Sequence, residues 1–450
     1  MNSGGLLLLN LIIAISMVIG IIVVLRWSPM VALILGSLSM GLGSGLGISE
    51  TVGRISTGFG DLMAGIGLSI GFGVIIGRLL YDCGGAHAVA VGVVRRVPER
   101  WAIYGIGLTA FLFSIPVFYD VTFVILVPLA LALAAELKRP LPYAVGAVAI
   151  GAGAAHTLVP PTPNPLAAAS IFQFELGIMV IVGLGVGLTA ALAAMKLYFM
   201  ILDRGLWSQD KDESGDAIAS REAVPDREAS PALALVPILL ALILILTGTI
   251  WTALAEEVPP LIQLISNKVV AMLAGAVAAY LVASRTLSSR EQEDSVAKAM
   301  SSAGVVLLVT GAGGAFGAVI KATGIGGLLA EGVGGSAHSG LMAVLATYFM
   351  ALVFRVSQGS GTVASITTMT IIAGAHLPAA AGLHPVWLAL AALAGGLSIG
   401  HVNDSGFWVT TKLSGFTLTG GLKTYTLGEL IVSVLVLAIT LAGSLALPRF

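Results

Sequence analysis

Charge is the scarcest property of this sequence. Only 10% of its 450 residues are Asp, Glu, Lys or Arg, whereas about a quarter of a typical soluble domain is charged. The formal net charge of −1 offers no basic surface for nucleic acid. The single cysteine, Cys83, excludes an intramolecular disulfide and is interpreted as a small apolar filler. Walker, Gly-x-Gly-x-x-Gly and Cys/His metal motifs do not occur, so we expect no cofactor and no metal.

Apolar residues dominate instead. They make up 57% of the chain, and the mean hydropathy is +1.01. Apolar runs of about 18 residues or more indicate membrane-spanning helices, so an all-α polytopic membrane protein is expected. The expected spans lie near 6–25, 29–47, 62–80, 142–175, 177–199, 233–254, 264–284, 299–321, 386–411 and 428–447, of which 142–175 and 386–411 are interrupted by polar residues and prolines or glycines.

Two further apolar stretches, 101–135 and 341–375, are too long for one helix and are broken in the middle. Cytoplasmic loops are enriched in Lys and Arg. Placing the basic loops inside gives 101–135 a basic loop at both ends, so this stretch enters and leaves the membrane on one side. Both stretches are therefore predicted to be re-entrant helical hairpins, the second entering from the outside.

The long hydrophilic segment 203–231 reads as a cytoplasmic linker between two halves, 1–202 and 232–450. Each half has about five spans and one hairpin. Because five is odd, the second half is inverted and both termini are predicted to be periplasmic. The hairpin breaks and the interrupted helices have nearly the same spacing between halves. Inverted repeats with helices broken at mid-membrane are typical of secondary transporters, and the breaks form the substrate site.

The first interrupted helix contains four prolines within 160–165, which cannot continue a helix. Backbone groups freed inside a membrane need partners from the protein or from cavity water, so this break is expected in the protein interior. A purely structural kink is the alternative. The candidate substrate-binding residues are Thr157, Pro161, Thr162 and Asn164, and His156 is a candidate proton carrier.

The second interrupted helix carries several polar groups within 401–405 in an otherwise apolar span. Ionisable groups at this depth are functional candidates by default, although a structural Asp–His pair would also fit. The candidate substrate ligands here are Asn403, Asp404 and Ser405. His401 and Asp404 are also candidates for carrying a proton.

The tip of the second hairpin combines glycines with hydroxyl groups. If Thr362 starts the returning helix, the positive end of the helix dipole favours an anion there. The candidates are Ser357, Gln358, Gly359, Ser360, Gly361 and Thr362. Arg355 either contacts the substrate or caps the hairpin. At the first tip, Tyr119 and Asp120 are candidates, with Asp120 as a possible proton carrier or structural partner.

Four segments resemble the gluconate permease (gluconate:H+ symporter) family of the ion transporter superfamily, in the family's order and over nearly the whole chain: 118–123, 156–168, 358–364 and 402–408. The resemblance implies proton-coupled uptake of a sugar acid or related hydroxy-acid across the bacterial inner membrane. It also implies a homodimer in lipid with a scaffold and a moving transport part, as in an elevator mechanism. Asn164 departs from the family pattern, where Gly commonly follows Pro-Thr-Pro.

Other interpretations stay open from the sequence. Relatives handle gluconate, other hexonates, glycerate, short hydroxy-acids or D-serine, and sodium coupling is not excluded. A channel lined by the glycines of 41–47 and 311–314 is one rival, although these more simply form helix-packing surfaces. An intramembrane aspartyl protease is the other, but its two motifs, at 58–61 and at Tyr119-Asp120, stand here in reversed order. No enzyme activity is expected.

Overall fold

The computed structural model describes residues 3–25, 27–85, 88–89, 98–115, 118–214, 230–255, 257–324, 339–401 and 404–449. Within these ranges the secondary structure is helical apart from one isolated antiparallel bridge between Glu213 and Phe416. The predicted all-α class is therefore confirmed.

The first half of the chain forms these elements: α1 (Ser3–Val23), α2 (Pro29–Gly43), α3 (Ile48–Asp82), η1 (Glu99–Trp101), α5 (Ala102–Phe113), α6 (Tyr119–Glu136), α7 (Leu141–Leu158), α8 (Pro163–Phe172), α9 (Leu176–Ile201), η2 (Leu202–Leu206) and α10 (Gln209–Asp212). The second half forms α11 (Pro231–Leu254), α12 (Pro260–Ser266), α13 (Lys268–Ala283), α14 (Ser289–Ala322), α16 (Ser339–Gln358), α17 (Gly361–Gly374), α18 (Leu377–Ala381), α19 (Pro385–Leu397), α20 (Ser405–Leu413), α21 (Leu418–Gly421), η4 (Leu422–Thr426) and α22 (Leu427–Ala446).

Several of these helices are long and apolar enough to cross a membrane. Among the described residues, five pass by length and composition: Ile48–Asp82, Leu141–Phe172, Leu176–Leu206, Pro231–Gly248 and Leu418–Ala446. A sixth is possible if α12 and α13 are counted as one span, although they bend by 61° where the sequence predicted a single helix over 264–284. Shorter apolar helical segments, of 10–17 residues, include Gly5–Val18, Met30–Gly43, Gly340–Val356, Gly361–Gly374 and Pro385–Leu397. The chain is a multi-pass membrane protein.

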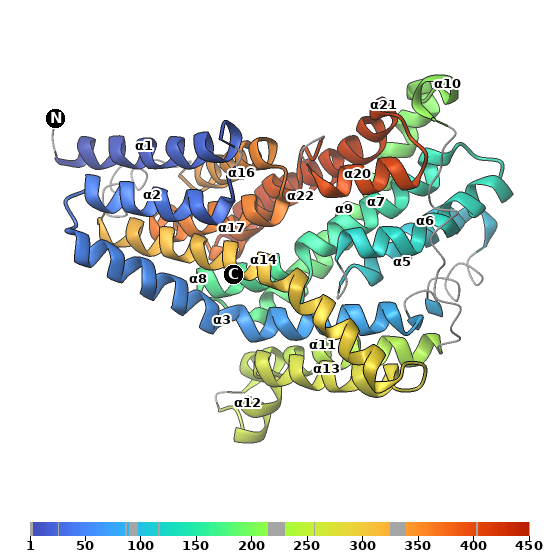
Figure 1. The fold of residues 1–450 in the computed structure, drawn as a ribbon, viewed down its shortest axis with the longest axis horizontal. Helices are drawn as coiled ribbons and strands as arrows, with labels where there is room; N and C mark the ends of the chain where they lie inside the picture. Colours follow the sequence, from blue (N-terminus) through green and yellow to red (C-terminus); the bar gives the residue numbers. More distant parts are fainter. Residues whose placement is uncertain are drawn as a thin grey trace.

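The helices form two regions (Figure 1). In the left part of the view α1, α2, α3 and α14 lie side by side, with contacts between successive members. In the right part α5, α6, α7, α9 and α20 to α22 gather. The group α11 to α13 covers α3 along the lower edge. Helix α8 of the broken pair α7/α8 contacts α17, and α20 of the broken pair α19/α20 contacts α6. These contacts bring the helix breaks together between the two regions.

The helices α3 and α14 are longer than the sequence predicted. The spans expected at 62–80 and 299–321 begin much earlier, at Ile48 and Ser289. Hydropathy missed the first turns because they carry charge on exposed faces, as in the Glu50–Arg54 pair at 3.3 Å. The two helices cross closely, since a Cβ atom on Gly314 would lie 2.6 Å from the Gly58 carbonyl oxygen. Gly311 and Gly314 therefore serve helix packing, which is the interpretation preferred from the sequence to a channel lining.

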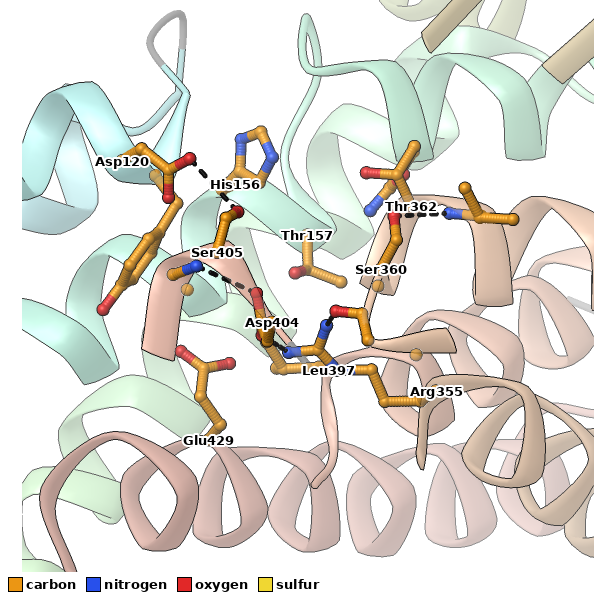
Figure 2. Close-up of a pocket in the computed structure, with 18 of the residues that line it drawn as sticks. Asp120, His156, Thr157, Arg355, Ser360, Thr362, Leu397, Asp404, Ser405 and Glu429 are labelled. Atoms are coloured by element: carbon orange, nitrogen blue, oxygen red, sulfur yellow. Dashed lines mark hydrogen bonds and ion pairs between the residues drawn. The ribbon is translucent and has the colours of Figure 1, made fainter. Parts of the chain in front are cut away.

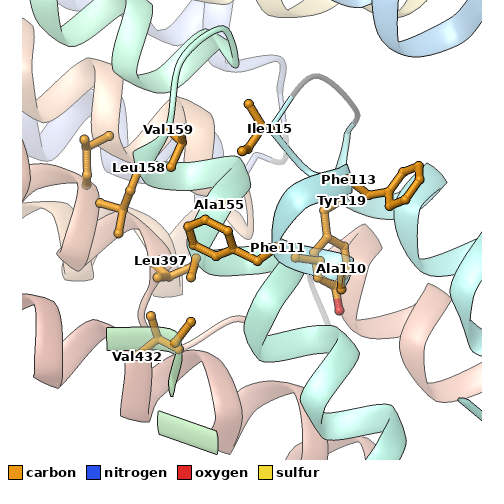
Figure 3. Close-up of a cluster of buried hydrophobic side chains, with 14 of the residues drawn as sticks. Ala110, Phe111, Phe113, Ile115, Tyr119, Ala155, Leu158, Val159, Leu397 and Val432 are labelled. Carbon is orange, nitrogen blue, oxygen red and sulfur yellow. The ribbon is translucent and has the colours of Figure 1, made fainter. Parts of the chain in front are cut away.

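Helices end inside all four stretches where the sequence predicted a break. The ends fall at Phe113/Tyr119, Leu158/Pro163, Gln358/Gly361 and Leu397/Ser405. At the second hairpin Gly359 has φ +79°, a conformation that costs little only for glycine. Apolar side chains pack behind the breaks, including Phe111, Leu158, Val159 and Leu397 (Figure 3). This core holds the helix termini at the breaks in position.

The first residues of the predicted linker are docked on the second half of the chain. Asp212 is fully buried; its Oδ2 accepts hydrogen bonds from Lys423 Nζ at 2.7 Å and from the Ser208 N–H at 2.8 Å. The Trp207 ring packs on Phe416 with centroids 4.9 Å apart. Burial alone would raise the pKa of Asp212, but the bonds from Lys423 and Ser208 outweigh it, and the pKa of this carboxyl is lowered.

Asp212→Asn is expected to destabilise this docked segment. Loss of the charge-assisted bond to Lys423 should cost about 1–3 kcal/mol and lower Tm by a few degrees in a thermal-unfolding scan. Because the folded-state pKa is lowered, the contribution is complete at neutral pH and is lost as the pH falls below about 4. The exposed neighbour change Asp210→Asn should leave Tm unchanged. Equal Tm values for the two variants would contradict the prediction.

Candidate functional site

A cavity of about 400 Å³ lies where the broken helices meet (Figure 2). This volume is within the range of small-molecule sites. Its walls come from both hairpins, both interrupted helices and the start of the last helix. Residues predicted from the sequence that line it are Tyr119, Asp120, His156, Thr157, Asn164, Arg355, Gly359, Ser360, Gly361, Thr362, Asp404 and Ser405.

Four helices begin at the cavity wall. The first residues of α6, α17 and α20 line it, and so does Asn164 at the second position of α8. The first turn of a helix has N–H groups without intrahelical partners and carries roughly +0.5 of an elementary charge. In α8 only Asn164 of the first three residues has an N–H, because the other two are prolines. The dipoles of four helix starts and the N–H groups of the other three still favour an anion in this cavity. The start of α17 at Gly361 lies one residue before the predicted start at Thr362.

Arg355 is the only Lys or Arg side chain among the described residues that line the cavity. It is 4% exposed, and its Nη2 donates to Asp404 Oδ2 and, at 3.2 Å, to the Tyr425 hydroxyl. Tyr425 in turn donates to Asp404 Oδ2 at 2.6 Å. Asp404 Oδ1 accepts the Gly406 N–H at 2.9 Å, which caps α20. Arg355 is thus fixed by a buried ion pair through Nη2, while its Nε has no hydrogen-bond partner among the described residues.

Arg355 also holds the second hairpin tip, because its Nη1 donates to the Gly359 carbonyl. The next residue, Ser360, accepts the Val363 N–H at 3.3 Å and caps α17. Gly400 lies against the same guanidinium, and a Cβ there would overlap it. Arg355 therefore caps the hairpin tip and also lines the cavity.

The opposite wall is formed by the first hairpin and the start of α20. Ser405 Oγ donates to Asp120 Oδ2 at 3.4 Å. The Tyr119 hydroxyl bonds Thr410 Oγ1 at 2.8 Å. The His156 ring faces Phe118, with centroids 5.5 Å apart. Figure 2 places Asp120 and His156 together on the side of the cavity opposite Thr362.

Neutral polar groups complete the wall. Thr157 and Asn164 are 6% and 2% exposed, and both line the cavity. Asn164 Oδ1 has no hydrogen-bond partner within the described ranges. A buried polar atom without a partner is costly, and a ligand that supplies a hydroxyl group would remove that cost.

Glu429 and Tyr425 line the cavity although the sequence interpretation did not select them. Tyr425 precedes the last apolar run and Glu429 lies at its start. Charged and aromatic residues at the end of a span usually mark the membrane interface. The signal available was the rule that an ionisable residue within a span is a functional candidate. Gly153 makes room for Glu429, because a Cβ there would overlap the carboxyl group.

Several predicted residues lie elsewhere. Pro161, Thr162 and His401 are not among the lining residues. Thr162 Oγ1 donates to the Val159 carbonyl at 2.7 Å, within the helix break. His401 Nε2 lies 3.2 Å from the Val356 carbonyl oxygen, behind the hairpin tip. Asn403 and the side chains of Ser357 and Gln358 lie outside the described part of the structure.

These features define a helical membrane permease, in which broken helices enclose a polar cavity suited to a small anion. Residues 6–446 match the model of the GntP family permeases, so the chain belongs to this family. The family consists of transporters and not enzymes, which confirms the resemblance seen in the sequence and sets the protease alternative aside.

Named relatives and one solved structure agree with this assignment. The inner membrane permease YgbN of Escherichia coli is 32% identical over 91% of this chain and 92% of its own length. A gluconate permease of Pseudomonas aeruginosa is 28% identical over 99% of both chains. The crystal structure of the YdaH transporter of Alcanivorax borkumensis matches with a TM-score of 0.58 and 16% identity over 90% of each chain, so the two share a fold.

Proposed function

We propose that this protein is a secondary active transporter that imports a small hydroxy-carboxylate, gluconate or a related sugar acid, together with protons. Relatives named gluconate permease and high-affinity gluconate transporter support the substrate class, at 28% identity over 99% and 95% of this chain. The bacterial inner membrane is the proposed location, as the name of the YgbN permease suggests for that relative.

The convergence of four helix N-termini on one cavity carries this proposal. The substrate carboxylate binds near Thr362 and Thr157, where the starts of α17 and α8 and the guanidinium of Arg355 favour negative charge. The hydroxyl groups of the substrate bind Asn164 and Ser405. Asp404 lines the same cavity, and Asn403 remains a proposed ligand of the substrate. Because fixed dipoles and a fixed ion pair need no rearrangement, the site is ready for an anion before one arrives.

The topology we propose follows the predicted repeats. Residues 1–202 and 232–450 each contain a hairpin, then an interrupted helix, then a long final helix, in the same order. The odd number of spans makes the halves inverted, with the linker 203–231 in the cytoplasm and both termini in the periplasm. The hairpins are re-entrant, and the cavity belongs to a moving part of a homodimer that works as an elevator.

The coupled proton has four candidates from the sequence: Asp120, His156, His401 and Asp404. Sodium coupling, or selectivity for another organic anion such as D-serine, is the alternative within the same family. Sodium coupling would be recognised by the ion gradient that drives accumulation. A different selectivity would be recognised by the substrate that competes best.

Uptake by the purified protein in proteoliposomes tests the function. With the interior made alkaline, labelled gluconate should accumulate above equilibrium, and a protonophore should abolish the accumulation. Unlabelled hexonates, glycerate and D-serine should compete in an order that defines the substrate. Protein-free liposomes are the control.

Each other result has a definite meaning. Accumulation that follows a sodium gradient and ignores pH would overturn proton coupling. Equilibration that ignores both gradients would indicate passive flux. If no hydroxy-carboxylate in the panel enters, the proposed function is wrong.

A further inference from the structure

Glu429 of α22 presents a buried carboxyl group to the cavity. It is 2% exposed, and its Oε1 has no hydrogen-bond partner in the ranges that the structure describes. An ionised carboxylate buried in this way is costly, and a carboxyl group avoids that cost by binding a proton. We propose that Glu429 is the proton-binding site of this carrier. The inference rests on the proposed function and names the group that holds its coupled proton.

The chain is built to keep this carboxyl group in place. Gly153 of α7 lies against it, and any Cβ at that position would overlap the Glu429 carboxyl group. The group therefore sits between the backbone of an interrupted helix and the cavity, within reach of both. Figure 2 shows Glu429 below Asp404, with no bond to the other residues drawn.

The other two carboxyl groups of the cavity each accept hydrogen bonds from neighbouring groups. Both oxygens of Asp404 are bonded, Oδ2 to Arg355 and Tyr425 and Oδ1 to the Gly406 N–H. Asp120 lies in the first turn of α6, where the helix dipole favours a negative charge, and Ser405 donates to it.

Glu429 has neither form of support. Its own helix continues without interruption from α21 through η4, so the carboxyl group does not lie at a free N-terminus of that helix. Among the carboxyl groups of the cavity, it gains most from protonation.

The charges around Glu429 explain why the proton and the substrate would bind together. The titratable groups that face it from the packed elements are Arg355 of α16, Asp404 at the start of α20, Tyr425 of η4, Tyr119 and Asp120 of α6 and His156 of α7. The Arg355 and Asp404 charges offset each other. An arriving substrate carboxylate would then add to the charges of Asp120 and Glu429, unless Glu429 is neutral.

The coupled step is a simple proton exchange. On the periplasmic side the Glu429 carboxylate takes a proton from water, and the substrate anion enters the cavity without meeting a second free charge. After the site turns inward, the substrate leaves and the carboxyl group releases its proton to the cytoplasm. One proton thus accompanies each anion through this group.

Glu429→Gln tests the assignment, because the amide keeps the shape of the side chain and cannot exchange a proton. In proteoliposomes, exchange of external labelled gluconate for internal gluconate should fall by a much smaller factor than accumulation does. Accumulation driven by a pH gradient should fall at least tenfold. Glu175→Gln, the same change at an exposed residue outside the cavity, should leave both activities unchanged.

A second variant and the wild type keep the test decisive if Glu429→Gln does not fold. Gly153→Ala leaves the glutamate but displaces its carboxyl group, and should lower accumulation more than exchange. If either variant accumulates gluconate in response to a pH gradient as well as the wild-type protein does, the assignment of Glu429 is wrong, while the proposed function stands. Failure of the wild-type protein to accumulate any hydroxy-carboxylate is a failure of the proposed function itself.

Discussion

Arg355→Met is expected to reduce gluconate uptake at least a hundredfold. The change removes the only Lys or Arg side chain among the described cavity residues, so an arriving carboxylate meets unbalanced negative charge. It also leaves Asp404 buried without its cation, and breaking a buried pair costs about 3–5 kcal/mol. Initial uptake rates and ligand-induced shifts in Tm measure the two effects separately.

A double variant separates the loss of binding from the loss of stability. Adding Asp404→Asn to Arg355→Met removes the unpaired charge and keeps an oxygen to cap α20. Its Tm should recover most of the way to wild type, while uptake stays at least a hundredfold lower. Arg78→Met breaks another Arg–Asp pair, the partly exposed pair with Asp82 at 2.8 Å within α3, and should leave uptake unchanged. Normal gluconate affinity in the double variant would rule out a role for Arg355 in the site.

The helix breaks could be predicted from sequence because their causes are local. Prolines at 160–165 and glycines at 359 and 361 act on their own backbone, and the observed ends at Leu158 and Gln358 follow from them. Helix lengths were less accessible. The early start of α3 depends on Glu50 and Arg54 lying on an exposed face, and an averaged hydropathy cannot separate the faces of one helix.

The cavity was only partly predictable, because its charge pattern depends on which partners meet. Arg355 and Asp404 were both selected, yet nothing local indicated that they form one buried pair. Glu429 was missed because a carboxylate at the head of an apolar run usually marks the membrane surface. Only the packing of α22 against Gly153 places it inside. Long-range pairing of this kind has no signature in a single sequence.

Thr362→Asp is expected to abolish uptake while leaving the protein as stable as wild type or slightly more so. Residue 362 is in the first turn of α17 and lines the cavity. A carboxylate there gains about 0.3–1 kcal/mol from the helix dipole, so folding is not impaired. The same charge repels a bound anion. At a separation of about 4 Å and an effective dielectric constant of about 20, the repulsion is about 4 kcal/mol, or roughly a thousandfold in affinity.

Opposite effects on stability and binding make this variant informative. A substitution that merely damaged the hairpin would lower Tm and uptake together, whereas an occupied anion site lowers uptake alone. Ala232→Asp places the same charge at the second position of α11, on an exposed surface outside the cavity, and should keep both uptake and Tm. Thr362→Ser retains the hydroxyl group and should transport within about threefold of wild type. Gluconate uptake by Thr362→Asp at the wild-type rate would place the carboxylate of the substrate away from the start of α17.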